Sequence, residues 1–276
     1  MKKSIFILIT LTISIFAKIN IVTSILPQVS FIKAIAGDKA NISLMVHRGS
    51  SPHTYEPKPS QMIDISKASI YFAIGVEFED VWLPKFKSIN SNINIVDLSK
   101  DIKKIEISNH HSSHHDHDHL DPHIWTNISN IKIIVNKIYK TLISIDSKNS
   151  DYYEKRLRLY MISLNLEDRE IRTLLKDIKS RELMVFHPSW GYFANEYNLT
   201  QVAVEIDGKS PKPKEIIAII KLAKKENIKA IFTQPEFSDK SAKIIAKEIG
   251  IDIIKVSPLS DDILKTILNI AKALSR

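Results

Sequence analysis

Short apolar runs alternate with longer amphipathic stretches along most of this chain. The short runs are bounded by turn or helix-start residues, a pattern typical of strands. Stretches with helical apolar spacing lie between them, for example at 216–226, 239–249 and 261–274. This alternation predicts an α/β protein with parallel sheets and helices on both faces. The predicted strands are 19–25, 41–46, 69–74, 92–96, 183–186, 201–204, 230–233 and 252–256.

The alternation is interrupted once, because residues 128–180 contain no strand-like run. Within this stretch, residues 151–179 lack Gly and Pro and have helical apolar spacing among dense charges. We therefore predict two α/β lobes, each a parallel sheet flanked by helices and each with its own apolar core, joined by one long rigid helix. The expected bounds are 18–147, 148–180 and 181–276. A coiled-coil dimerisation arm is disfavoured because the apolar positions keep no strict heptad.

The N-terminus has the layout of an export signal. Lys2 and Lys3 precede an apolar stretch that closes on Ala17, which predicts a signal peptide over residues 1–17. Ile15 stands where a small residue is preferred, so retention as a membrane anchor is the alternative. The chain has no cysteine, which excludes a lipid-anchoring cysteine, a disulfide framework and thiolate ligands. We expect a periplasmic protein in which any metal ligands would have to be histidines and carboxylates.

The formal net charge is +8, from lysines scattered through the chain without a basic block. We interpret this as a solvated surface and expect no nucleic-acid partner. Because a basic surface does not attract divalent cations, any binding of such a cation would have to rely on local ligand chemistry.

Six of the ten histidines fall in one polar segment, residues 109–120. Imidazole is a good ligand for zinc, copper and nickel, and the Ser and Asp spacers offer little to bury. The run is internal and broken by aspartates, which argues against an expression tag; a simple polar linker is the other alternative. We predict weak, auxiliary metal capture by His110, His111, His114, His115, His117 and His119.

The other histidines are His47, His53, His123 and His187. His53, His123 and His187 each adjoin a proline at a predicted strand-to-helix connection, and such loops converge at the carboxyl ends of parallel strands. His47 lacks this context and fits a surface residue. Three imidazoles suffice for a tetrahedral zinc site with one further position.

These motifs resemble those of the ZnuA-type zinc receptors of ABC importers, over essentially the whole chain after residue 17. The matching segments are 52–60 (PHTYEPKPS), 121–125 (DPHIW) and 187–193 (HPSWGYF). The resemblance implies that His53, His123 and His187 bind a metal ion between the lobes and that the receptor delivers it to a membrane permease with its ATPase. Manganese and iron relatives usually carry a carboxylate at the third motif, so His187 favours zinc, as does ligand softness.

One position departs from that family pattern. Ser257 stands where relatives commonly present an aspartate after the last strand. Water, a histidine of the 110–119 run or Asp261 could complete the coordination, and Asp261 is also a good helix-start residue. Trp125, Trp190, Tyr192 and Phe193 are expected to exclude water from the site.

We expect Zn²⁺ binding and transport by a monomer, not catalysis. A manganese or iron receptor of the same family is the nearest alternative. A zinc-dependent hydrolase would also use three histidines and a bound water, but no His-Glu-x-x-His motif is present. An adhesin or a metal buffer without a transporter also stays open.

Overall fold

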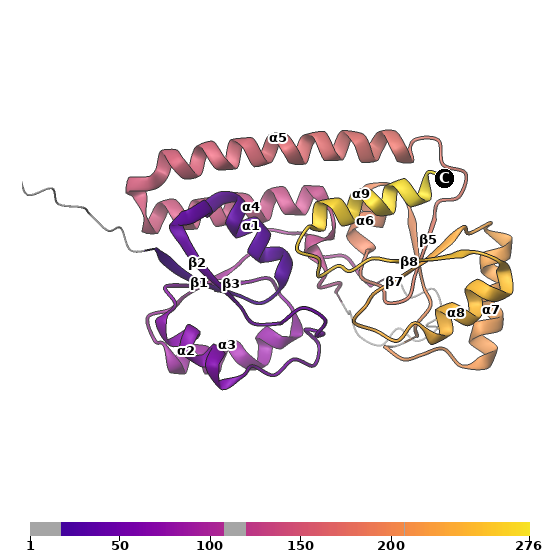
Figure 1. Ribbon diagram of the computed structural model, residues 1–276, viewed down its shortest axis with the longest axis horizontal. Helices are drawn as coiled ribbons and strands as arrows, with labels where there is room; N and C mark the ends of the chain where they lie inside the picture. The colour runs from indigo at the N-terminus through magenta and orange to yellow at the C-terminus, as the bar shows by residue number, and fades with distance from the viewer. Residues whose placement is uncertain (1–17, 108–119, 207) are drawn as a thin grey trace, which may run out of the picture.

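The computed structural model describes residues 18–107, 120–206 and 208–276. The predicted signal peptide and the six-histidine run fall outside these residues. Within them, the structure has two four-stranded parallel sheets, and their strand orders are β2-β1-β3-β4 and β6-β5-β7-β8 (Figure 1). The predicted fold class is therefore confirmed.

All eight predicted strands are present, with bounds that differ by at most two residues. The first sheet contains β1 (Ile19–Thr23), β2 (Ala40–Leu44), β3 (Ile70–Ala73) and β4 (Asn94–Asp97). The second contains β5 (Glu182–Val185), β6 (Thr200–Ala203), β7 (Ala230–Thr233) and β8 (Asp252–Lys255). In both sheets the strand that comes first in the chain is central and the second lies at an edge.

The helices begin and end at residues suited to those positions. Pro lies in the first turn of α1, α2 and α7, where a missing N–H removes no helical hydrogen bond. Gly250 ends α8 with φ of 70°, a left-handed conformation that favours glycine. The helices are α1 (Leu26–Ala36), α2 (Pro59–Lys67), α3 (Glu77–Ile89), α4 (Ile128–Ile145), α5 (Ser150–Leu175), α6 (Gly191–Glu196), α7 (Pro213–Lys225), α8 (Lys240–Ile249) and α9 (Ile263–Leu274).

The strandless stretch forms two helices, and the longer, α5, has 26 residues. It packs on α1 beside the first sheet and on α9 beside the second, so that it runs along both lobes (Figure 1). Helix α4, which the sequence interpretation did not single out, lies against α5. The exact lobe bounds stay a prediction.

The prediction of a separate apolar core for each lobe is wrong. The largest cluster of buried side chains contains Ile70 of the first sheet, Ile171 of α5 and Val185 of the second sheet. A smaller cluster lies between the second sheet and helices α7 and α8. Because α5, α4 and α9 each have an apolar face toward the lobes, they join the two cores into one, which ties the lobes together.

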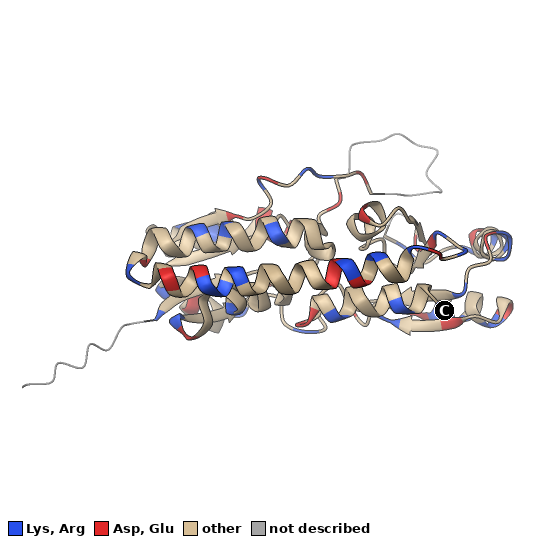
Figure 2. Ribbon diagram, turned by 90° about the horizontal axis from the view of Figure 1, so that it is seen from above, with Lys and Arg blue, Asp and Glu red and all other residues tan. Residues whose placement is uncertain are grey.

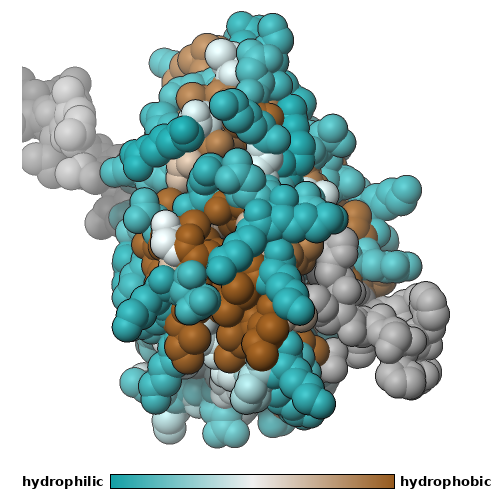
Figure 3. Space-filling view, turned by 90° about the vertical axis from the view of Figure 1, so that its right-hand side faces the viewer, coloured by the Kyte–Doolittle hydropathy of each residue, from teal (hydrophilic) through white to brown (hydrophobic). Residues whose placement is uncertain are grey.

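The outer surface mixes charge and apolar side chains. Acidic and basic residues are interspersed along α5 (Figure 2). The end of the molecule that carries α7 and α8 has an apolar area surrounded by hydrophilic residues (Figure 3), and Ile217 and Ile244 are exposed on these helices. In the part of the chain that the structure describes, no helix combines the length and apolar character that crossing a membrane requires.

Candidate metal centre

His53 lies in the coil between β2 and α2. Its backbone N–H donates to Ser51 Oγ over 3.3 Å, and the preceding Pro52 is buried. The ring Nδ1 is hydrogen-bonded to Oε2 of Glu77, the first residue of α3. The orientation of this imidazole therefore depends on a residue from a different loop.

His123 lies in a tight turn that leads into α4. Its backbone N–H and its Nδ1 both contact Oδ1 of Asp121, at 2.9 and 2.7 Å, and the Asp121 N–H donates to the Ile105 carbonyl over 2.7 Å. The ring centroids of His123 and Trp125 are 5.5 Å apart, and the Trp125 Nε1–H donates to the Pro258 carbonyl over 2.7 Å. This turn is therefore fixed on one side by its own aspartate and on the other by the second lobe.

His187 follows the end of the central strand β5. The neighbouring strand β7 ends before Gln234, which accepts from the His187 N–H over 3.2 Å and donates to its carbonyl over 2.9 Å. On the other side, Glu205 follows β6, and its Oε1 lies 2.7 Å from His187 Nδ1. The ring of Phe237 stacks on the imidazole, with 4.4 Å between centroids and an interplanar angle of 21°. His187 is held from both neighbouring strands and on one ring face.

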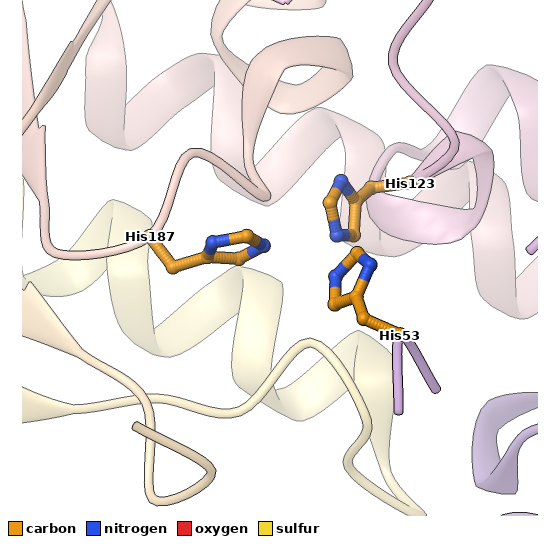
Figure 4. Close-up of side chains that lie close together, drawn as sticks. All are labelled: His53, His123 and His187. Carbon is orange, nitrogen blue, oxygen red and sulfur yellow. The ribbon is translucent and has the colours of Figure 1, made fainter. Parts of the chain in front are cut away.

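The three imidazoles converge between the lobes (Figure 4). Each offers a ligand atom, and these atoms all lie within 4.8 Å of one another. In each ring Nδ1 contacts a carboxylate, which leaves Nε2 as the metal-facing nitrogen. His187 Nε2 is buried and has no hydrogen-bond partner among the described residues. Nitrogens on one tetrahedral zinc ion lie roughly 3.4 Å apart, so each would move inward by less than about 1 Å.

The surroundings of two of these groups, His187 and Glu77, favour the protonation states that suit metal binding. Burial lowers the pKa of His187, against the hydrogen bond to Glu205, which raises it. The hydrogen bond from His53 lowers the pKa of Glu77, against partial burial. A neutral imidazole can ligate a metal directly, and an ionised carboxylate behind an imidazole increases its basicity.

The structure thus brings His53, His123 and His187 together and leaves other candidates apart, while the role of these histidines as metal ligands stays a prediction. His47 is exposed, with its ring centroid 6.0 Å from that of Tyr55. Ser257 donates to Glu236 Oε1 over 2.5 Å, and Asp261 pairs with Arg48 at 2.7 Å. None of these belongs to the cluster of ligand atoms among the described residues.

The four aromatic residues proposed to exclude water are buried. A fifth aromatic residue stacks on one of the histidines. Trp125, Trp190, Tyr192 and Phe193 are at most 3% exposed. Phe237, which sequence reasoning missed, covers the His187 ring.

The carboxylates Glu77 and Glu205 were also missed. They are 24 and 18 residues from their histidine partners, so no local motif pairs them. Their positions in the sequence could have indicated them. Each glutamate follows a predicted strand and therefore lies at the same edge of its sheet as the histidine.

Comparison with known proteins identifies the family. The family described as zinc-uptake complex component A, periplasmic, ZnuA, matches residues 21–273. The high-affinity zinc uptake system protein ZnuA of Bacillus subtilis is 30% identical over 248 residues, covering 84% of this chain and 76% of the relative. This chain belongs to the ZnuA family.

Other relatives differ in length and in the metal named. The zinc-binding protein AdcA of Streptococcus pyogenes is 26% identical over 88% of this chain, which spans only 50% of that relative. The manganese ABC transporter substrate-binding lipoprotein scaA of Streptococcus gordonii is 29% identical, covering 86% of this chain and 78% of its own length. This chain is thus similar to proteins named for two different metals, zinc and manganese.

Solved structures agree with the family assignment. A crystal structure of ZnuA is 34% identical with a TM-score of 0.85, covering 94% of this chain and 98% of the other. A zinc-bound ZnuA deletion mutant is 35% identical with the same TM-score, covering 94% and 97%. ZnuA-family proteins are metal-binding solute receptors of ABC importers and not enzymes, so the hydrolase alternative is set aside.

Proposed function

We propose that this chain is the zinc receptor of an ABC importer and that His53, His123 and His187 are its metal ligands. One observation carries the proposal. Three imidazoles from separate loops offer ligand atoms within 4.8 Å of one another, and each is backed by a carboxylate on Nδ1. Such carboxylate–histidine pairs orient and strengthen imidazole ligands in zinc sites.

Ligand chemistry supports zinc over manganese. The cluster of described ligand atoms contains three nitrogens and no oxygen, and imidazole suits zinc whereas carboxylate and water suit manganese. The Irving–Williams order also places zinc well above manganese at nitrogen ligands. The Bacillus subtilis relative is named for zinc uptake and the ZnuA deletion mutant was solved with zinc bound, which supports the same metal for this chain.

The wider transport scheme is part of the same proposal. The chain is exported by residues 1–17, acts as a monomer in the periplasm, and passes zinc to a permease coupled to an ATPase. The run of residues 110–119 collects zinc weakly. Release involves small tilts of the lobes, because the shared core and the packing of α5 on both lobes oppose wide hinge motion.

Competition between metals tests the proposal. The purified chain is titrated with zinc and with manganese against a chelator of known affinity. We expect one tight zinc site and manganese binding weaker by about 10³-fold or more. Manganese binding as tight as zinc would favour the manganese receptor, and the absence of any tight site would refute a metal receptor altogether. His47→Ala is the matched control, because it removes an imidazole outside the cluster.

A further inference from the structure

The three carboxylates behind the histidines differ in their exposure to solvent. The side chains of Asp121 and Glu205 are 0% and 5% exposed, whereas that of Glu77 is 58% exposed. The histidines follow the same order: 7% for His123, 12% for His187 and 29% for His53. Solvent therefore reaches the cluster on the side of Glu77 and His53.

The two buried pairs are also the better anchored ones. His123 is bonded to Asp121 through both its backbone and its ring, and His187 is bracketed by Glu205 and Gln234. His53 lies in a coil and reaches Glu77 across to the start of α3.

Glu77 carries its negative charge in a favourable place. It is the first residue of α3, where the helix dipole stabilises an anion. Its side chain is 58% exposed, while its Oε2 is hydrogen-bonded to Nδ1 of His53. This carboxylate therefore faces the cluster on one side and water on the other.

Two other carboxylates that follow strands of the second sheet have partners, although Oε2 of Glu236 is buried without one among the described residues. Asp261 forms an ion pair with Arg48, and Glu236 accepts a hydrogen bond from Ser257. The chain has a formal net charge of +8, which repels an incoming cation. A single exposed carboxylate beside the histidines should therefore increase the rate of cation association.

We infer that Glu77 is the capture residue of the site: its carboxylate takes up the hydrated cation from solvent and passes it to His53, His123 and His187. This inference rests on the proposed function. It assigns Glu77 a kinetic role, in addition to orienting His53, that the buried Asp121 and Glu205 do not share.

Stopped-flow measurement of zinc association and dissociation, with zinc ion alone and a fluorescent chelator as reporter, tests this inference. In Glu77→Gln we expect association to slow by about 5-fold at low salt, and this difference to shrink at high salt as the charge is screened. In Glu205→Gln we expect faster dissociation with association within about 2-fold of wild type, because that carboxylate only positions its histidine. Asp80→Asn is the matched control, since it removes an exposed charge from the same helical turn.

Glu77→Asp separates capture from positioning. It keeps the charge but is one methylene shorter, so zinc association should be within about 2-fold of wild type, whereas dissociation should be faster than in wild type because His53 is oriented less well. Melting temperatures of the metal-free variants check that each is folded.

The outcomes distinguish this inference from the proposed function. Tight zinc binding by wild type with unchanged association in Glu77→Gln overturns the capture role and leaves the receptor intact. Slowing in Asp80→Asn equal to that in Glu77→Gln also overturns it, because the effect would then belong to the general field of the helix. Slower zinc association in Glu236→Gln, with no slowing in Glu77→Gln, would overturn the capture role of Glu77 and assign it to Glu236. Absence of tight binding in wild type would defeat the proposed function itself.

Discussion

The two sheets have the same strand order but place their histidines at different strands. In the second sheet His187 follows the central strand β5, with Glu205 after the edge strand β6 and Gln234 after β7. In the first sheet His53 follows the edge strand β2, and its carboxylate, Glu77, follows β3. The end of the central strand β1 carries Ser24 instead, whose hydroxyl donates to the buried Glu79.

This difference explains why one candidate ligand, His187, has more contacts and is less exposed than the other, His53. A residue beyond a central strand has a neighbouring loop on each side, and both hold His187. A residue beyond an edge strand has a neighbour on one side only, which leaves His53 in a more exposed coil. The account therefore predicts a preformed half-site of His123 and His187 that His53 completes when the ion arrives.

Removal of a ligand has the largest expected effect. Zinc affinity should fall by about 10³-fold in His123→Ala and His187→Ala, since three or four ligands share a binding free energy of about 10–16 kcal/mol, or about 4 kcal/mol each. His53→Ala should lose less, about 10²-fold, because ordering of its coil offsets part of its contribution. Chelator competition measures all three, with His47→Ala as the control. Equal losses of zinc affinity at the three positions would contradict the distinction between a preformed half-site, His123 and His187, and the more loosely held His53.

Removal of a buried carboxylate should have a smaller effect. Asp121→Asn and Glu205→Gln should each lower zinc affinity by about 10- to 100-fold, because an imidazole loses the group that orients it and raises its basicity. Competition titration by isothermal calorimetry measures the change in affinity. Glu248→Gln, which alters an exposed residue of α8, is the control. Wild-type affinity in both variants would show that the carboxylates do not support the ligands.

The titration of His187 tests whether its imidazole is buried, in contrast to the more exposed imidazole of His53. Burial lowers the pKa of this imidazole from 6.5, so the neutral form is favoured in the folded chain. As the pH falls below 6.5 the unfolded state takes up this proton first, so the contribution of His187 to stability is present above 6.5 and lost on acidification. NMR titration of the metal-free ring should give a midpoint below 6.5. A midpoint at or above 6.5 would contradict the buried, fixed position assigned to it.

Deletion of residues 110–119 should have the smallest effect on tight binding. If His53, His123 and His187 form the tight site, equilibrium affinity for one zinc ion should stay within about 3-fold of wild type, while weak additional binding is lost. Equilibrium dialysis at low and high zinc separates the two. Loss of the tight site in the deletion variant would mean that the run supplies a primary ligand.

The fold could be predicted almost entirely from local patterns. Buried parallel strands appear as short apolar runs between helices. The predicted bounds of β7 match the structure, whereas the predicted ranges for β1 and β8 end two residues and one residue too late. The order of the strands and the continuity of the core could not, because they depend on packing between elements distant in sequence, such as Ile171 of α5 against both lobes.

The metal centre was predictable to the extent that its residues carry local motifs. His53, His123 and His187 each adjoin a proline, and Asp121 stands two residues before His123. Glu77, Glu205 and Phe237 have no such marker, since each meets its histidine only through the sheet topology. Sequence reasoning therefore identified the candidate ligands and missed the side chains that hold two of them in position.

A crystal structure of the chain loaded with one equivalent of zinc, with anomalous diffraction at the zinc edge, tests the central claim most directly. The account predicts a single strong peak between the lobes, bonded to Nε2 of His53, His123 and His187 at about 2.0–2.1 Å. A zinc ion bound elsewhere, or bonded to fewer than three of these imidazoles, would contradict it.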